Sequence, residues 1–172
     1  MGENDMRRIL SALILVVMLL STLASCGLDV PRPEIKDGRF NISFTYEYNG
    51  EVKTLSGVYV CKYDGLGFTL EGTNYVAWEE SFEGEINDDV TMLGYTEDGG
   101  EIFISLLMYP EYFMGEPAYA EFTPTARLEL FYYEDGTVSE SYDDSETLAS
   151  YGVKLISFEY DEPIENSYKP LI

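Results

Sequence analysis

Residues 39–63 read RFNISFTYEYNGEVKTLSGVYVCKY, and this stretch decides the fold. Apolar and aromatic side chains occupy every second position from Phe40 to Tyr48, which is typical of a β-strand with one buried face. Asn49-Gly50 follows directly and favours the positive φ angles of a two-residue hairpin turn. Strand-like sequence resumes from Val52 to Tyr63. The stretch therefore predicts two antiparallel strands joined by a tight turn.

Glycine turns punctuate the rest of the chain in the same way. Glu97–Gly100 and Glu134–Gly136 are turn sequences that predict two further hairpins. We expect strands at residues 90–96, 101–109, 125–133, 137–142 and 153–160, a separate short run at 68–71 after Asp64-Gly65, one short helix at 145–152, and an extended tail marked by Pro163 and Pro170. Many short strands without long helices predict an all-β fold, a two-sheet β-sandwich of the immunoglobulin-like or jelly-roll kind.

The N-terminal residues have the pattern of an export signal. Arg7 and Arg8 precede an apolar run, Ile9–Leu20, that is too short to span a bilayer, and the small residues of Leu23-Ala24-Ser25-Cys26 follow. Met6 is an alternative start to Met1, because the acids at positions 3 and 5 are unusual ahead of such a segment. An ordinary secretory signal needs no cysteine at the cleavage point, and a transmembrane helix needs about twenty apolar residues.

Leu23-Ala24-Ser25-Cys26 resembles the lipobox of prokaryotic membrane lipoproteins. That resemblance implies that lipid is attached to the Cys26 thiol, that residues 1–25 are removed as a signal helix, and that the protein is anchored in the cell membrane facing outside the cytoplasm. Residues 26–38, with two prolines and no hydrophobic period, are expected to form a tether, and residues 39–172 the β-sandwich domain. The body, with its Asn-Gly hairpin and Tyr151-Gly-Val run, is similar to small β-rich lipoproteins of unassigned function from anaerobic Gram-positive bacteria; this implies no activity.

The chain is strongly acidic, with a net charge of -22. Removal of residues 1–25 leaves this charge unchanged, because that segment carries two acids and two bases. Such a field repels phosphate backbones, so nucleic acid is not expected as a partner. The simplest reason for the acidity is solubility, and cations or basic partners are otherwise favoured.

The residue types present exclude several chemistries. The chain has no histidine, so Ser-His-Asp and Cys-His catalysis and histidine-ligated zinc are impossible with this chain alone. With Cys26 lipidated, Cys61 has no partner for a disulfide, and its apolar neighbours predict a small buried hydrophobe. We therefore expect no cofactor and no enzyme activity of those kinds.

Carboxylates are the remaining candidates for catalysis or metal binding. Glu79-Glu80 beside Trp78 is the most site-like pair for a glycan-acting enzyme, although adjacent strand residues point to opposite faces. Asn87–Asp89 and Asp143–Glu146 are acidic loop clusters, but neither has the spacing of a calcium-binding EF-hand loop, and turn formation is the simpler explanation. No catalytic or metal-binding residue is assigned.

The segment Met108–Pro117 is unusually apolar for a loop. It either caps the core or presents a contact surface, and the cap is favoured. The candidate ligand contacts are Tyr109, Tyr112 and Phe113, with Trp78, and we expect Tyr112 or Phe113 to present part of its ring to solvent. The sequence thus indicates a lipid-anchored surface protein with a binding or contact domain for a cell-wall glycan or another protein. The alternatives are a carboxylate-dependent glycan-acting enzyme and a structural subunit of an envelope assembly.

Overall fold

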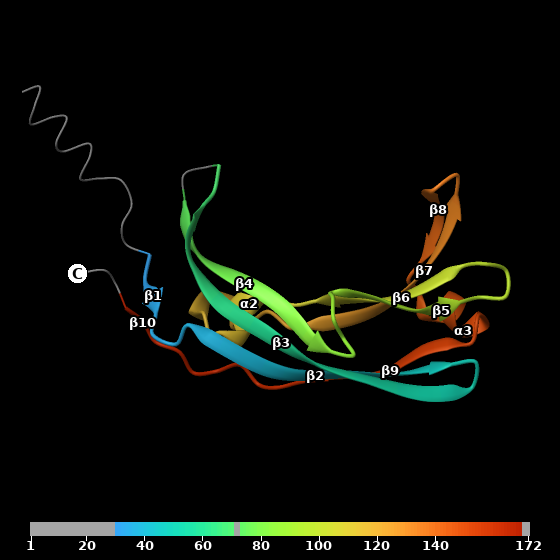
Figure 1. Ribbon diagram of the computed structural model, residues 1–172, viewed down its shortest axis with the longest axis horizontal. Helices are drawn as coiled ribbons and strands as arrows, with labels where there is room; N and C mark the ends of the chain where they lie inside the picture. Colours follow the sequence, from blue (N-terminus) through green and yellow to red (C-terminus); the bar gives the residue numbers. More distant parts are fainter. Residues whose placement is uncertain (1–29, 71–72, 170–172) are drawn as a thin grey trace, which may run out of the picture.

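The computed structural model describes residues 30–70 and 73–169, and within them the chain is an all-β sandwich, as predicted (Figure 1). One antiparallel sheet has the strand order β4-β3-β2-β9, and the other has the order β5-β6-β7-β8. The elements are β1 (Arg32–Pro33), β2 (Asp37–Tyr48), β3 (Glu51–Phe68), β4 (Asn74–Gly84), β5 (Val90–Tyr95), β6 (Glu101–Leu107), α2 (Pro110–Phe113), the 3-10 turn η1 (Pro117–Tyr119), β7 (Thr125–Glu134), β8 (Thr137–Tyr142), α3 (Ser145–Ser150), β9 (Val153–Tyr160) and β10 (Tyr168–Lys169).

The three predicted hairpins are confirmed. Tyr48 pairs with Glu51 across Asn49-Gly50, whose φ angles of 52° and 79° are those of a tight two-residue turn. The β7–β8 turn has the same geometry at Asp135-Gly136, so it contains two residues rather than the three expected. In the turn between β5 and β6, the Thr96 backbone NH donates to the Gly100 oxygen at 2.8 Å, and the Gly99 NH donates to the Thr96 oxygen at 3.1 Å. Local turn chemistry thus sets the register of both sheets.

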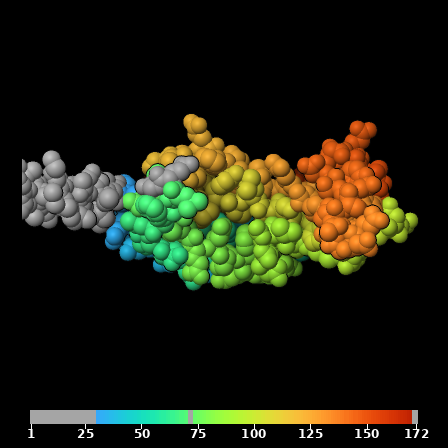
Figure 2. Space-filling model, turned by 90° about the horizontal axis from the view of Figure 1, so that it is seen from above, coloured from blue at the N-terminus to red at the C-terminus, as the bar shows by residue number. Residues whose placement is uncertain are grey.

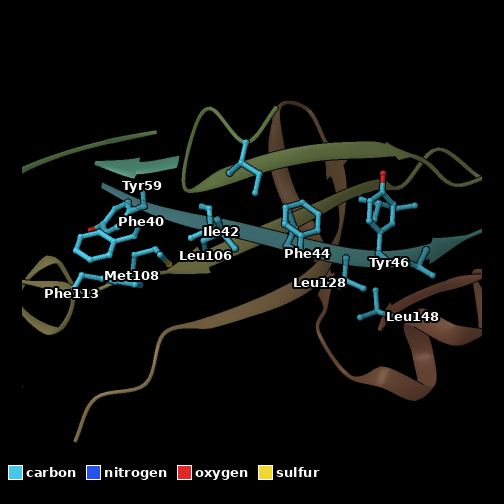
Figure 3. Close-up of a cluster of buried hydrophobic side chains, with 14 of the residues drawn as sticks. Phe40, Ile42, Phe44, Tyr46, Tyr59, Leu106, Met108, Phe113, Leu128 and Leu148 are labelled. Atoms are coloured by element: carbon cyan, nitrogen blue, oxygen red, sulfur yellow. The ribbon is translucent and has the colours of Figure 1, made fainter. Parts of the chain in front are cut away.

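Alternation places one face of each sheet in a shared core (Figure 3). The first four apolar positions of β2 are buried, as predicted from their spacing. The opposing sheet contributes alternate residues of β6 and β7. The centre of the core comprises Phe40, Ile42, Phe44, Tyr46, Tyr59, Cys61, Ile102, Ile104, Leu106, Leu128 and Leu130. Cys61 is buried, as predicted, and burial raises the pKa of its thiol to about 12.

The expected break after Tyr63 is wrong, because β3 continues to Phe68. Asp64 is left out of the pairing with β4, and Gly65 follows with a φ of 98°. Asp64-Gly65 therefore forms a β-bulge, which bends a strand without ending it. Of the separate run expected at 68–71, only Phe68 belongs to a strand, as the last residue of β3; Thr69 and Leu70 follow it as loop and turn, and residue 71 lies outside the described residues. The less regular stretch at residues 74–84 forms β4, which pairs with β3.

The last part of the predicted tether, residues 32–38, lies within the folded domain. Arg32 and Pro33 pair with Lys169 and Tyr168, and β2 begins at Asp37. The backbone NH of Glu34 also donates to the Ser167 oxygen at 2.8 Å. The proline-marked tail therefore returns along the start of the domain, and both ends of the described chain lie at the same end of the sandwich (Figure 1).

The predicted short helix is confirmed as α3. Its cap is Asp144, one residue before the expected serine start, and the Asp144 carboxylate accepts a bond from the Thr147 backbone NH at 2.8 Å. Gly152 follows the helix with a φ of 71°. No helix among the described residues is long and apolar enough to cross a membrane. The predicted signal segment and Cys26 lie outside those residues.

Candidate functional site

The apolar segment at residues 108–117 folds back onto one end of the core. Tyr109 precedes α2 in an extended conformation, and Pro110 occupies the first turn of this helix, where its missing NH costs nothing. The turn places Phe113 inside, fully buried and with its ring 4.8 Å from that of Phe40 and 5.2 Å from that of Tyr59. Phe113 is therefore part of the core, and its assignment as a ligand contact is wrong.

The other two candidates in this segment are half-buried. Part of the Tyr112 side chain is exposed, as expected for either Tyr112 or Phe113. Its ring packs edge-on against those of Phe113 and Tyr160. Tyr109 packs against Phe122, with ring centroids 4.9 Å apart, and Phe122 itself is 42% exposed. These side chains rest against protein on one side, so the segment is mainly the predicted cap.

Trp78, the fourth candidate contact, lies on β4 with its ring packed against the core. Glu80 occupies the same face of the strand, since it pairs with buried Cys61 and accepts a hydrogen bond from the Tyr59 hydroxyl. Glu79 is exposed on the opposite face, where it pairs with Lys62. As strand alternation predicted, the two adjacent glutamates lie on opposite faces, and they do not act together.

Two carboxylates that the sequence analysis did not single out join Trp78 and Glu80. Glu111 and Glu116 are half-buried, and desolvation raises the pKa of each carboxyl. The charge of Glu80 raises the pKa of Glu111 further, and Glu111 does the same to Glu116. Two acids in an otherwise apolar loop are the signal that could have identified them.

We call Trp78, Glu80, Glu111 and Glu116 the carboxylate cluster. The Trp78 indole Nε1 and the Glu116 Oε2 are both buried, and a hydrogen bond from Trp78 to the Glu116 carboxylate partly offsets the rise in the pKa of Glu116. Neighbouring carboxyl groups with raised proton affinity, such as Glu111 and Glu116, are used in general acid–base chemistry. In the part of the chain that the structure describes, no group of three or more His, Cys, Asp or Glu side chains is placed to hold a metal ion.

Glu80 also lines a hollow of about 590 Å³ along the side of the sandwich. The other acids of this hollow are Asp88 and Asp89, from one of the acidic loop clusters. A hydrogen bond with Asp88 raises the pKa of the Asp89 carboxyl. The Asp88 carboxylate accepts a bond from the Asp89 backbone NH at 2.8 Å and Asp144 caps α3, so both acidic clusters make the local contacts expected of turn residues.

A second hollow, which we call the distal hollow, is lined by segments that lie at the end of the sandwich opposite β1 and β10 (Figure 1). Figure 2 shows the same order along the long axis, with the blue N-terminal residues of the domain at one end and the yellow-green residues of the β5–β6 turn at the other. It has a volume of about 420 Å³, and three separate segments form it: the β2–β3 turn, the β5–β6 turn and the connection from α3 to β9. Its lining comprises Tyr48, Asn49, Tyr95, Thr96, Glu97, Asp98, Ser150, Tyr151 and Gly152.

Hydrogen bonds fix the walls of the distal hollow. The Tyr48 hydroxyl donates to the backbone oxygen of Tyr95, which ties the first sheet to the second. The Asp98 carboxylate accepts bonds from the Thr96 hydroxyl at 2.6 Å and from the Tyr132 hydroxyl at 2.8 Å. These two donors lower the pKa of Asp98, so its carboxylate stays ionised.

Comparisons with protein-family models, curated proteins and solved structures find no match for this chain. The function is therefore inferred from the fold and from the geometry of the hollows. Of the residues singled out in the sequence, only Trp78 and Glu80 meet in a cluster with further carboxylates. None of the candidate site residues lines the distal hollow, whose residues come from three turns far apart in the sequence.

Proposed function

We propose that the protein is a lipid-anchored cell-surface protein whose β-sandwich is a binding domain. The position of the distal hollow is the observation that supports this most strongly. The first strand, β1, begins at Arg32, only six residues after Cys26, and lies at the end of the sandwich where it pairs with β10 (Figure 1). The hollow opens at the other end, so a lipid on Cys26 would leave it pointing away from the membrane.

The composition of the hollow also favours binding. Pockets that recognise small groups are usually preformed, with aromatic walls and a few placed polar groups. The distal hollow has tyrosine walls, and hydrogen bonds hold the Tyr48 hydroxyl and the Asp98 carboxylate in place. Loops at one end of a β-sandwich are common positions for recognition because the sheets hold them rigidly.

A carboxylate-dependent glycan-acting enzyme is the second candidate, and the carboxylate cluster favours it. Glu111 and Glu116 have raised pKa values, and Glu80 connects them to a hollow. Such an enzyme needs an acid and a base or nucleophile on opposite sides of the scissile bond. Hydrolysis of a glycan that is lost in Glu111→Gln, with an unchanged melting temperature, would favour this function over simple binding.

Membrane attachment is tested by Cys26→Ser. We expect the wild-type protein in the membrane fraction, and the variant either released or left with residues 1–25 attached, with an unchanged melting temperature. The two acyl chains of a lipobox cysteine give stable attachment, at about 0.8 kcal/mol per buried methylene. Cys61→Ala is the control, since this buried thiol belongs to the core and its loss should not affect attachment. A Cys26→Ser protein that is cut after Ser25 and stays in the membrane would contradict the proposal.

A further inference from the structure

The distal hollow is lined by charge of one sign. Its acidic residues are Glu97 and Asp98, and its lining contains no lysine or arginine. The chain as a whole carries a net charge of -22, and a hollow lined by one sign of charge concentrates the field of the surrounding protein. A positively charged group is therefore the ligand that this hollow attracts.

The two carboxylates have different roles. Asp98 is held by the Thr96 and Tyr132 hydroxyls, so it fixes the shape of the turn. The Glu97 side chain is exposed and makes no hydrogen bond or ion pair with any other residue that the structure describes. Glu97 is consequently the carboxylate that can turn to a ligand without breaking an existing contact.

A tyrosine ring of the hollow already holds an ammonium group. Lys53 places its Nζ 5.6 Å from the centroid of the Tyr48 ring, within the range of a cation–π contact. Its nearest carboxylate is that of Glu51, at 3.7 Å, and not one from the hollow. Because the Tyr48 hydroxyl is engaged with Tyr95 and the ring lies beside Gly94, the part of the ring that lines the hollow is what a ligand can contact. Lys53 thus shows which chemical group suits this ring.

We infer that the distal hollow binds a lysyl side chain of a peptide, with the ammonium group between the Glu97 carboxylate and the tyrosine rings. A volume of about 420 Å³ lies near the lower end of the range for ligand pockets, so it fits one long side chain and not a folded domain. Asn49 adds a side-chain amide to the lining of the hollow that can bond to the peptide backbone, whereas the Ser150 hydroxyl already donates to the Thr147 oxygen at 2.6 Å. This inference rests on the proposed function, because a surface-anchored binding domain would present the hollow to peptides outside the cell.

The test is a titration of the full-length protein in neutral detergent with three blocked tripeptides, Gly-Lys-Gly, Gly-norleucine-Gly and Gly-Glu-Gly. We expect binding of the lysine peptide alone, since norleucine has the aliphatic chain without the ammonium. Glu97→Gln should weaken that binding about threefold to fivefold, the upper part of the range for an exposed ion pair. Glu134→Gln is the matched control, because it removes the same charge from an exposed turn residue outside the hollow and should change the affinity less than twofold.

Lys53→Ala is expected to change the affinity in the opposite direction. Removing its ammonium frees the face of Tyr48, so binding of the lysine peptide should become about twofold to fivefold tighter. Lys62→Ala, with the same change in charge on the same strand but towards the other end, should have a smaller effect.

Three outcomes would overturn the inference: equal binding of the lysine and norleucine peptides, equal effects of Glu97→Gln and Glu134→Gln, or binding of n-butylamine as tight as that of the lysine peptide. Binding of a neutral disaccharide in place of the lysine peptide would overturn the ligand class and leave the binding domain standing. Loss of membrane attachment in the wild-type protein would contradict the anchor without affecting any of these titrations.

Discussion

Phe113→Ala is expected to lower the free energy of unfolding by about 3–5 kcal/mol, the usual cost of deleting a buried phenylalanine. Phe113 is fully buried, and its ring contacts those of Phe40, Tyr59 and Tyr160. The cavity would open at the end of the core, where two sheets and α2 meet, and these cannot close together without moving the sheets. Denaturant unfolding monitored by tryptophan fluorescence measures the loss.

Tyr112→Ala is the control for this substitution. Tyr112 is the neighbouring residue of the same helical turn but is only half-buried, so its loss should cost less than half as much. Equal costs of about 1 kcal/mol or less would mean that the segment is a loose contact surface and not a cap.

Gly115→Ala is expected to destabilise the protein by about 2–5 kcal/mol for two combined reasons. Gly115 has a φ of 69°, where an L-residue costs about 1–2 kcal/mol. A Cβ atom there would also overlap the backbone oxygen of Ile164, and overpacking adds about 1–3 kcal/mol. Gly99→Ala isolates the first cost, because Gly99 has a φ of 93° but no atom near its Cβ position. Equal changes in melting temperature for the two variants would contradict the close packing at Gly115.

This close packing reflects how the C-terminal segment clamps the cap. The Ile164 backbone NH donates to the Phe113 oxygen at 2.9 Å, and the Asn166 and Tyr168 side chains both donate to the Met114 oxygen at 3.1 Å. Since β10 also pairs with β1, the clamp joins the cap to the start of the described chain. The cap is thus held from outside as well as from the core.

The elements that the sequence predicted well depend on local chemistry. Asn49-Gly50 and Asp135-Gly136 adopt positive φ angles that few other dipeptides tolerate, and alternation around them fixes which face is buried. Asp64-Gly65 has a similar composition but forms a bulge, because the pairing of β3 with β4 continues beyond it. A turn reverses the chain, whereas a bulge lies within a strand that stays paired with a neighbour. The neighbouring strand decides between them, and the local sequence does not contain it.

The candidate site was harder to predict for the same reason. Which of Tyr112 and Phe113 is buried depends on the rotational orientation of a single helical turn. Only the packing of Phe113 against Phe40 decides that orientation. Glu111 and Glu116 become a cluster with Glu80 only after α2 folds against β4. The distal hollow brings together residues near positions 48, 97 and 151, and nothing in each segment alone indicates a shared wall.

Attachment of this domain to a membrane through Cys26 is tested most directly by the intact mass of the protein extracted from membranes of cells that make it. We predict a polypeptide that begins at Cys26, with a mass increased by a diacylglyceryl group and, if the amine is also acylated, by one further acyl chain. A membrane form that retains residues 1–25, or a protein that begins elsewhere and carries no lipid, would contradict the proposed anchor.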